Sequence, residues 1–242
     1  MFEIIFTVPL LILILWVLFS HHKTTEKKAR MINMSLFSIK SIESFTEELD
    51  LLNIFKNMHL KGWNRFLYGD PYVSLEKTIQ NGKTDYCVAI PKKYEGILEQ
   101  NPHVLKIGKN ILPEGKHYAV IYLHKRQPAI ELGDLKLHED EGVALQILAR
   151  HIHPVRGRGA LWALAASNGV HDGRGHFESN IRVMAWADSL DRVRRILNQQ
   201  KVNERTNRKN VFDFFSRIFE NNKRVKLSIG DLKNFLINKF VY

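Results

Sequence analysis

The sequence predicts an α+β protein in which an N-terminal transmembrane helix precedes one or two ferredoxin-like (split β-α-β) modules with antiparallel sheets. Three observations predict this class. Residues 4–19 form an apolar run, alternating apolar segments are interleaved with segments of helical period, and Asn81 and Gly82 join two β-rich segments. With 242 residues, 45% hydrophobic and 25% charged, the chain can form one ordinary domain or two small ones.

The apolar run IIFTVPLLILILWVLF, residues 4–19, is expected to cross a lipid bilayer as one helix. Glu3 precedes the run and basic residues follow it, whereas a secretory signal peptide carries its positive charge first. The basic residues are Lys23, Lys27, Lys28 and Arg30. The positive-inside rule therefore predicts a single-pass protein of the cell membrane with its C-terminal part in the cytoplasm. Residues 1–22 are the anchor and residues 23–33 a basic linker; a buried N-terminal helix is the alternative.

The segment 34–112 is predicted to form the first ferredoxin-like module. Its expected elements are a strand at 34–40, a helix at 41–62, strands at 72–80 and 83–90, a helix at 91–100 and a strand at 103–109. Ser44 and Glu47 have capping-box spacing at the start of the long helix, and Gly62 can end it. In the β-α-β-β-α-β order, both helices lie on one face of an antiparallel sheet.

The segment 113–202 is predicted to be a second α+β module. Its expected elements are strands at 118–125, 142–153 and 176–187, then a helix that Asp188 caps. Apolar residues alternate in the last two strands, which is typical of half-buried members of a sheet. Asp191 and Arg195 have the i, i+4 spacing of an ion pair. The arginines of this helix are expected to point away from the sheet.

The segment 203–242 is a basic, aromatic extension in which Ser228 is expected to cap a short terminal helix. Leu232, Phe235 and Phe240 would be exposed if nothing packed on them. Phe235 and Phe240 are therefore candidates for docking a protein partner.

Basic residues are concentrated between residues 192 and 226, in a chain of formal net charge +11. The candidates for binding nucleic acid or an acidic surface are Arg192, Arg194, Arg195, Arg205, Arg208 and Lys209. Phe212, Phe214 and Phe215 could stack on bases or belong to the core. The charge could equally face acidic lipids or serve solubility.

Recognisable catalytic motifs are absent: the sequence contains no P-loop, dinucleotide-binding, nucleophile-elbow, zincin or EF-hand pattern. We therefore expect neither a catalytic site nor a cofactor. Four histidines, at positions 151, 153, 171 and 176, could in principle ligate a metal, but histidines at strand ends commonly face water. The single cysteine, Cys87, excludes an intrachain disulfide.

Six segments follow one another in a recognisable order: the membrane helix, MSLFSIK, the long helix ending at Gly62, the hairpin segment, EGVALQILARHI and HFESNIRVMAWADSLDRVRRIL. In this order they resemble the membrane-anchored N-terminal region of FtsK/HerA-superclass ATPases. These ATPases are akin to type IV secretion coupling proteins. The segment KLSIGDLKNFLIN also resembles the region that precedes their ATPase core, although Gly230 departs from that pattern. The ATPase domain and its catalytic residues have no counterpart here.

The resemblance implies a non-catalytic, cytoplasmic platform or accessory subunit of a DNA-translocation or conjugation machine. Its expected partners are a separate P-loop ATPase, other copies of itself, or both, together with the bilayer through residues 4–19. The alternative function is a membrane-tethered nucleic-acid-binding module that uses residues 192–226.

Overall fold

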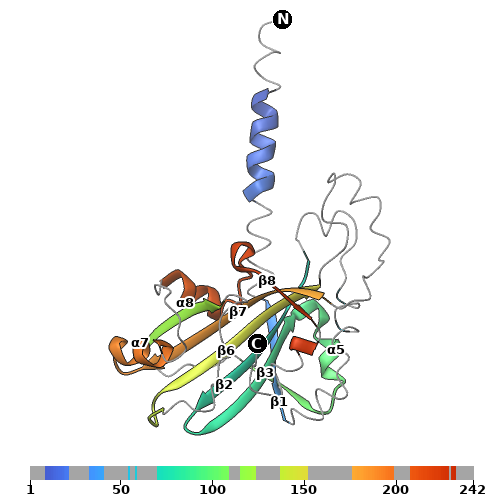
Figure 1. Cartoon of the computed structure of the whole chain (residues 1–242). Helices are drawn as coiled ribbons and strands as arrows, with labels where there is room; N and C mark the ends of the chain where they lie inside the picture. The colour runs from blue at the N-terminus through green and yellow to red at the C-terminus, as the bar shows by residue number, and fades with distance from the viewer. Residues whose placement is uncertain are drawn as a thin grey trace, which may run out of the picture.

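The computed structural model describes residues 9–21, 33–40, 54, 58, 70–108, 115–123, 137–151, 176–198, 208–228 and 230–232. They form a mixed α+β structure around one antiparallel sheet, which confirms the α+β class and the antiparallel pairing of the prediction (Figure 1). The strands are β1 Met34–Ile39, β2 Val73–Gln80, β3 Lys83–Pro91, β4 Val104–Ile107, β5 His117–Leu123, β6 Gly142–His151, β7 His176–Ala187 and β8 Val225–Ser228. The helices include α5 Gly96–Glu99, α7 Leu190–Asn198 and α8 Arg208–Phe215, with short 3₁₀ turns η1 Lys92–Tyr94 and η3 Asn221–Lys223.

The strands of the first predicted module lie in the order β4-β1-β3-β2, and each adjacent pair is antiparallel. β3 therefore separates β1 from β2, and β1 separates β3 from β4. Asn81 and Gly82 have φ angles of 52° and 68°, as a type I′ turn requires, so the hairpin prediction is confirmed. The helix predicted at 91–100 is instead two short turns, η1 and α5, with Gly96 beginning the second one.

The long helix predicted at 41–62 lies outside the described residues except for two positions. Ile54 and Met58 are both buried in the main core, and the Met58 amide donates to the Ile54 carbonyl at 3.0 Å, as in a helical turn.

The second predicted module joins the first, because β2 pairs with β6 from Val73↔Ala149 to Gln80↔Gly142. The order continues β2-β6-β7-β5, so the boundary expected after residue 112 lies between strands of one sheet. The described strands of both predicted modules thus belong to one sheet. A local pattern of strands carries no information on which distant edge each strand will join.

The long strand β7 has three partners. One edge pairs with β6, and the other edge pairs with β8 over residues 176–179 and with β5 over residues 181–187. β8 and β5 thus lie end to end along the same edge. This arrangement attaches the C-terminal strand to the middle of the fold.

The sheet has two different faces. The first carries a continuous apolar core that includes β6 residues at odd positions 143–149 and packs against α5 and α7. The second carries two smaller apolar clusters, one around Phe214 of α8 and one around Phe219. β6 is consequently buried on both faces rather than half-buried, because α8 and the segment after it cover the face expected to meet water.

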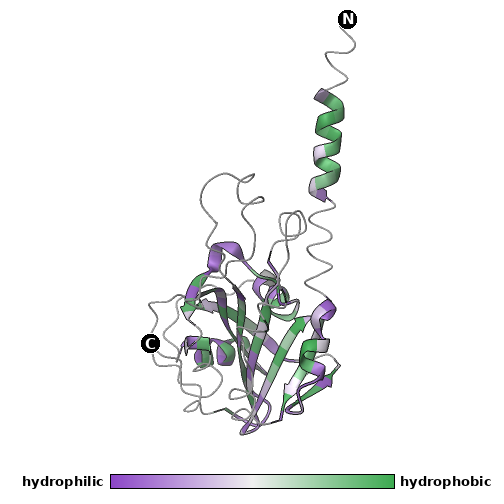
Figure 2. Ribbon diagram, turned by 90° about the vertical axis from the view of Figure 1, so that its right-hand side faces the viewer, coloured by the Kyte–Doolittle hydropathy of each residue, from purple (hydrophilic) through white to green (hydrophobic). Residues whose placement is uncertain are grey.

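Helix 9–21 stands clear of the sheet in Figure 1 and is hydrophobic along most of its length in Figure 2. Every residue from Leu10 to Phe19 is 43–66% exposed. Within the described part of the chain, no helix reaches the length and apolar content that a membrane span requires. Residues 4–8 of the predicted span lie outside the described residues.

Gly142, at the start of β6, faces Trp186 of β7 in the register. A Cβ atom at Gly142 would overlap the Trp186 indole ring, which is 2% exposed and cannot easily move. We expect Gly142→Ala to lower the free energy of unfolding by about 1–3 kcal/mol, the usual cost of overpacking. The measurement is urea denaturation followed by circular dichroism.

The matched control is Gly108→Ala, since a Cβ there meets nothing within 4 Å. A Gly142→Ala variant as stable as the wild type would show that the indole ring does not occupy this position.

Candidate functional site

The second face of the sheet carries a row of buried polar side chains on three neighbouring strands, β2, β6 and β7. They are Ser74, Glu76, Gln146, Arg150, Glu178, Asn180 and Arg182, and we call them the polar layer. They occupy alternate positions on their strands and therefore share one face. Residues 208–224, which comprise α8, the turn after it and η3, cover this layer and are called the strap. Removing so many charged groups from water costs free energy, and the layer's hydrogen bonds and ion pairs must offset this cost. The partners in these contacts therefore show what the layer binds.

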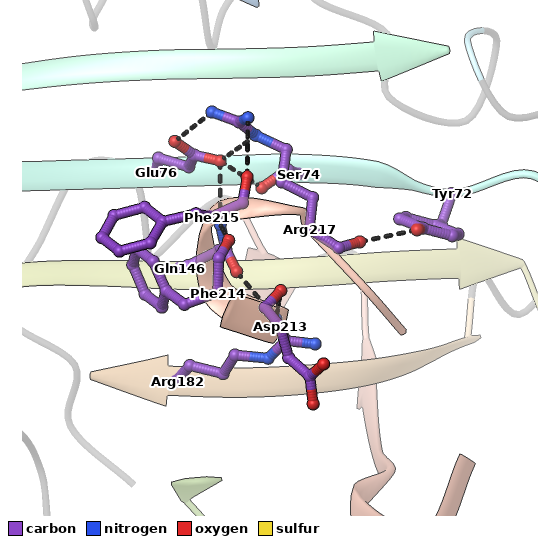
Figure 3. Close-up of polar contacts among 9 residues, drawn as sticks. All are labelled: Tyr72, Ser74, Glu76, Gln146, Arg182, Asp213, Phe214, Phe215 and Arg217. Atoms are coloured by element: carbon purple, nitrogen blue, oxygen red, sulfur yellow. Dashed lines mark hydrogen bonds and ion pairs between the residues drawn. The ribbon is translucent and has the colours of Figure 1, made fainter. Parts of the chain in front are cut away.

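Glu76 of β2 binds Arg217 of the strap through two hydrogen bonds (Figure 3). The Glu76 Oε1 to Arg217 Nε distance is 2.6 Å, and the Oε2 to Nη2 distance is 3.0 Å. Ser74 and Gln146 also donate to Oε1, at 2.6 and 3.0 Å. Burial raises the pKa of Glu76, but the charge and hydrogen bonds of Arg217 and the bonds from Ser74 and Gln146 outweigh it and hold this pKa below its ordinary value. Glu76 is therefore a carboxylate fixed by its donors.

Arg217 also ends α8 in an unusual way. Its φ is 51°, in the left-handed region where glycine is normally found. The Arg217 amide donates to Phe214 O at 3.1 Å and the Ile218 amide to Asp213 O at 2.9 Å, which is the bonding pattern of a Schellman motif. An arginine at this position, where glycine is the easier choice, indicates that the side chain is needed for its pair with Glu76.

Arg182 of β7 binds backbone carbonyls at the C-terminal end of α8 and just after it. Its guanidinium donates to Asp213 O at 2.7 Å and to Gln146 Oε1 at 3.2 Å (Figure 3). It also donates to Ile218 O. A cation is favourable there because helix carbonyls lack intrahelical partners at this end. Burial lowers the pKa of Arg182, while nearby tyrosine and carboxyl groups oppose the shift. The ring of Tyr122 lies 5.0 Å from the guanidinium carbon.

The far end of the strap is held by Arg150, Glu178 and Asn180. Arg150 Nη2 lies 2.7 Å from Glu178 Oε2, and Arg224 of the strap approaches the other carboxylate oxygen at 3.0 Å. The Asn180 side chain accepts from the Glu220 amide at 2.6 Å and donates to the carbonyls of Glu220 and Lys223. The polar layer thus contacts the strap from residue 213 to residue 224.

This geometry binds a segment of the chain rather than arranging groups for proton transfer. The layer's ionised side chains contact a group of opposite charge or the backbone carbonyls of the strap. Among the described residues, no group of three or more His, Cys, Asp and Glu side chains could hold a metal ion. Of the four histidines, 153 and 171 lie outside these residues, as do the side chains of the other two.

Sequence reasoning misses the polar layer. Polar residues at alternate positions of VSLE, LQILAR and FESNIR resemble a strand face that meets water. The available signal is that Glu76, Gln146 and Arg182 lie well inside strands that are rich in apolar residues. Charged side chains are rarely buried in such strands unless they are paired.

The basic residues of α7 separate into two kinds. Arg192 pairs with Glu141, with a 2.6 Å distance from Nε to Oε1, and its side chain is 24% exposed. Hydrogen bonding to Arg192 lowers the pKa of Glu141, which is only 4% exposed although its neighbours in the acidic run, Glu139 and Asp140, are exposed. Arg194 and Arg195 are exposed as expected.

The caps of the C-terminal helices can be compared with the predictions. Ser189, and not Asp188, accepts from the Arg192 amide at the start of α7, because Asp188 pairs with Lys116. Asp191 contacts Arg194 at i+3 rather than Arg195 at i+4.

The cap predicted at Ser228 is confirmed. Its hydroxyl accepts from the Asp231 amide at 3.1 Å, and Asp231 Oδ2 accepts from the Ser228 amide at 2.7 Å. Leu232 is fully buried in the main core, so other parts of the chain do pack on it.

The remaining candidates are only partly described. Arg205, Phe235 and Phe240 lie outside the described residues, and Arg208 and Lys209 begin α8 with side chains that are not described. Phe214 is buried in the core, Phe215 is partly buried, and Phe212 is 60% exposed. Of the predicted basic residues, only Arg192, Arg194 and Arg195 of α7 have described side chains.

In comparisons with known proteins, no family model matches the chain, and neither does any curated protein or solved structure.

Proposed function

We propose that this chain is a non-catalytic, membrane-anchored platform in the cytoplasm that serves a DNA-translocation or conjugation machine of the type IV secretion kind. Helix 9–21 carries the proposal: its apolar residues are exposed on all sides, beside a sheet whose own apolar residues are buried. A helix that packs on protein buries one stripe, whereas a helix in lipid is apolar all round. Residues 4–8, which begin the apolar run, would extend helix 9–21 toward the length of a span.

We also propose that the platform contains a ferredoxin-like module, and the strand order supports this. In β4-β1-β3-β2, each pair of strands expected to be joined through a helix has another strand between its members, which is the split β-α-β arrangement. The proposal of a DNA-translocation or conjugation machine comes from the resemblance of the sequence to the N-terminal region of FtsK/HerA-superclass ATPases. A separate P-loop ATPase, further copies of this chain, or both would complete it.

The platform is favoured over the nucleic-acid-binding module because many basic groups of residues 192–226 have internal partners. Arg192, Arg217 and Arg224 pair with Glu141, Glu76 and Glu178. An arginine held by a carboxylate must break that pair before it binds a phosphate. Arg194, which Asp191 contacts, and Arg195 and Lys226 are exposed.

The anchor is tested by flotation of the full-length chain with liposomes after an alkaline wash. We expect the wild type to float with the lipid and the variant Leu11→Lys/Leu15→Lys to remain at the bottom, because each lysine near the bilayer centre costs about 3 kcal/mol. The control is Phe212→Lys, which places the same charge on an exposed apolar site of α8. Wild-type protein that the alkaline wash removes, or a double-lysine variant that floats equally well, would contradict the anchor.

A further inference from the structure

β4 is the strand at one end of the sheet, and it exposes an apolar side chain there. Leu105 is 55% exposed, whereas the β5 residues 119–123, at the opposite end of the strand order, are at most 5% exposed. An accessible strand edge readily pairs with a strand of another chain. Outside helix 9–21, the exposed large apolar residues of the described chain are Leu105, Leu190 and Phe212.

The backbone of β4 offers hydrogen-bonding groups on its outer side. The Lys40 amide donates to the His103 carbonyl at 2.9 Å, in continuation of the β1-β4 register. In an antiparallel pair, alternate residues direct their N–H and C=O groups to opposite sides of the strand. Leu105, like His103, therefore bonds toward β1. Val104 and Lys106 direct their backbone groups outward.

The lysine of this edge has its charge balanced within the chain. A charged side chain on an edge strand commonly opposes pairing with a second sheet. Lys106 Nζ, however, lies 2.8 Å from Glu95 Oε2 and 2.9 Å from Glu99 Oε1. Lys106 is opposite Phe37 in the register, on the first face, so it lies on the other side of the sheet from Leu105. The exposed leucine is thus not shielded by this charge.

These features make the edge complementary to itself. When two copies of β4 run antiparallel with Leu105 opposite the partner's Leu105, the outward groups of Val104 meet those of Lys106 in the other copy. Leu105 then occupies a non-hydrogen-bonded pair, in which facing side chains approach most closely. A second copy therefore supplies both the backbone partners and the apolar contact that this edge lacks within the described fold.

From these observations we infer that β4 is the interface of a twofold-symmetric dimer, in which two copies pair through their β4 strands and continue one sheet into the other. The interface is isologous, because the same residues of both copies face each other. It rests on the folded domain alone and not on the membrane anchor. It gives the further copies of this chain in the proposed function a defined contact surface.

The register is tested by oxidative cross-linking of the full-length chain in detergent, in a Cys87→Ser background. Leu105→Cys places two Cα atoms about 4.5 Å apart, within the range of a disulfide. We expect it to form a covalent dimer at least about tenfold faster than Lys106→Cys, because the two Lys106 positions are offset by about 7 Å along the strands. Phe212→Cys, at another exposed apolar site, reports the rate of random collision. Equal rates at all three positions would overturn the inference.

The dimer itself is measured by light scattering of the full-length chain in detergent. We expect a dimer mass for the wild type and a monomer mass for Leu105→Asp, because two carboxylates would then face each other across the pair. Phe212→Asp is the matched control and should keep the dimer mass. A monomeric wild type, or a Leu105→Asp variant that remains dimeric, would contradict this interface. Flotation with liposomes reads the anchor separately, so failure of the anchor and failure of the dimer give different results.

Discussion

Replacing Arg182 with methionine is expected to lower the free energy of unfolding by about 3 kcal/mol. Methionine fills much of the volume but donates no hydrogen bond, so the carbonyls of Asp213 and Ile218 lose the donor that Arg182 supplies at the end of α8. Gln146 Oε1 loses one as well. Urea denaturation followed by circular dichroism measures the change.

Arg195→Met is the matched control for this prediction, because Arg195 is an exposed arginine on α7. Its effect should stay within about 0.5 kcal/mol. If both variants were equally stable, Arg182 would not be what holds the end of α8.

Glu76→Gln is expected to lower the free energy of unfolding by about 3–5 kcal/mol. The amide cannot neutralise Arg217, whose side chain remains largely buried at 16% exposure. A double-mutant cycle with Arg217→Met isolates the interaction, and the double variant should be more stable than the sum of the single losses predicts. Strict additivity of the two losses would contradict direct pairing.

The same substitution should change the acid sensitivity of the protein. The pKa of Glu76 in the folded state lies below its ordinary value of 4.5, so its carboxylate stabilises the fold at higher pH, and this stability is lost as the pH falls through the folded-state pKa. The wild type should therefore lose stability steadily below about pH 4.5. Glu76→Gln should show a shallower slope there, and an unchanged slope would assign the acid sensitivity to other carboxylates, such as Glu141.

The strands could be predicted because their information is local. Alternation from residue 176 to residue 187 and the pair Asn81-Gly82 specify period and turn within a few residues of chain. The predicted strands at 34–40, 72–80, 83–90 and 176–187 therefore lie within one or two residues of the observed ones.

The polar layer could not be predicted because its information is distant. Glu76 and Arg217 are separated by 141 residues, and Arg192 and Glu141 by 51. A sequence pattern shows Arg192 and Arg217 as two members of a basic stretch, and only the folded chain shows that each has a buried carboxylate beside it. The predicted membrane helix is an intermediate case: its composition predicts lipid contact, and its described residues, 9–21, are all exposed.

The central claim, a membrane platform for a motor encoded on another chain, is tested most directly by purifying the detergent-solubilised, full-length protein from its native cell and identifying what accompanies it. The account predicts that the protein is recovered from the membrane fraction together with a P-loop ATPase. Recovery with nucleic acid and without such an ATPase would contradict the platform and favour the binding module with Arg194 and Arg195 as the first residues to change.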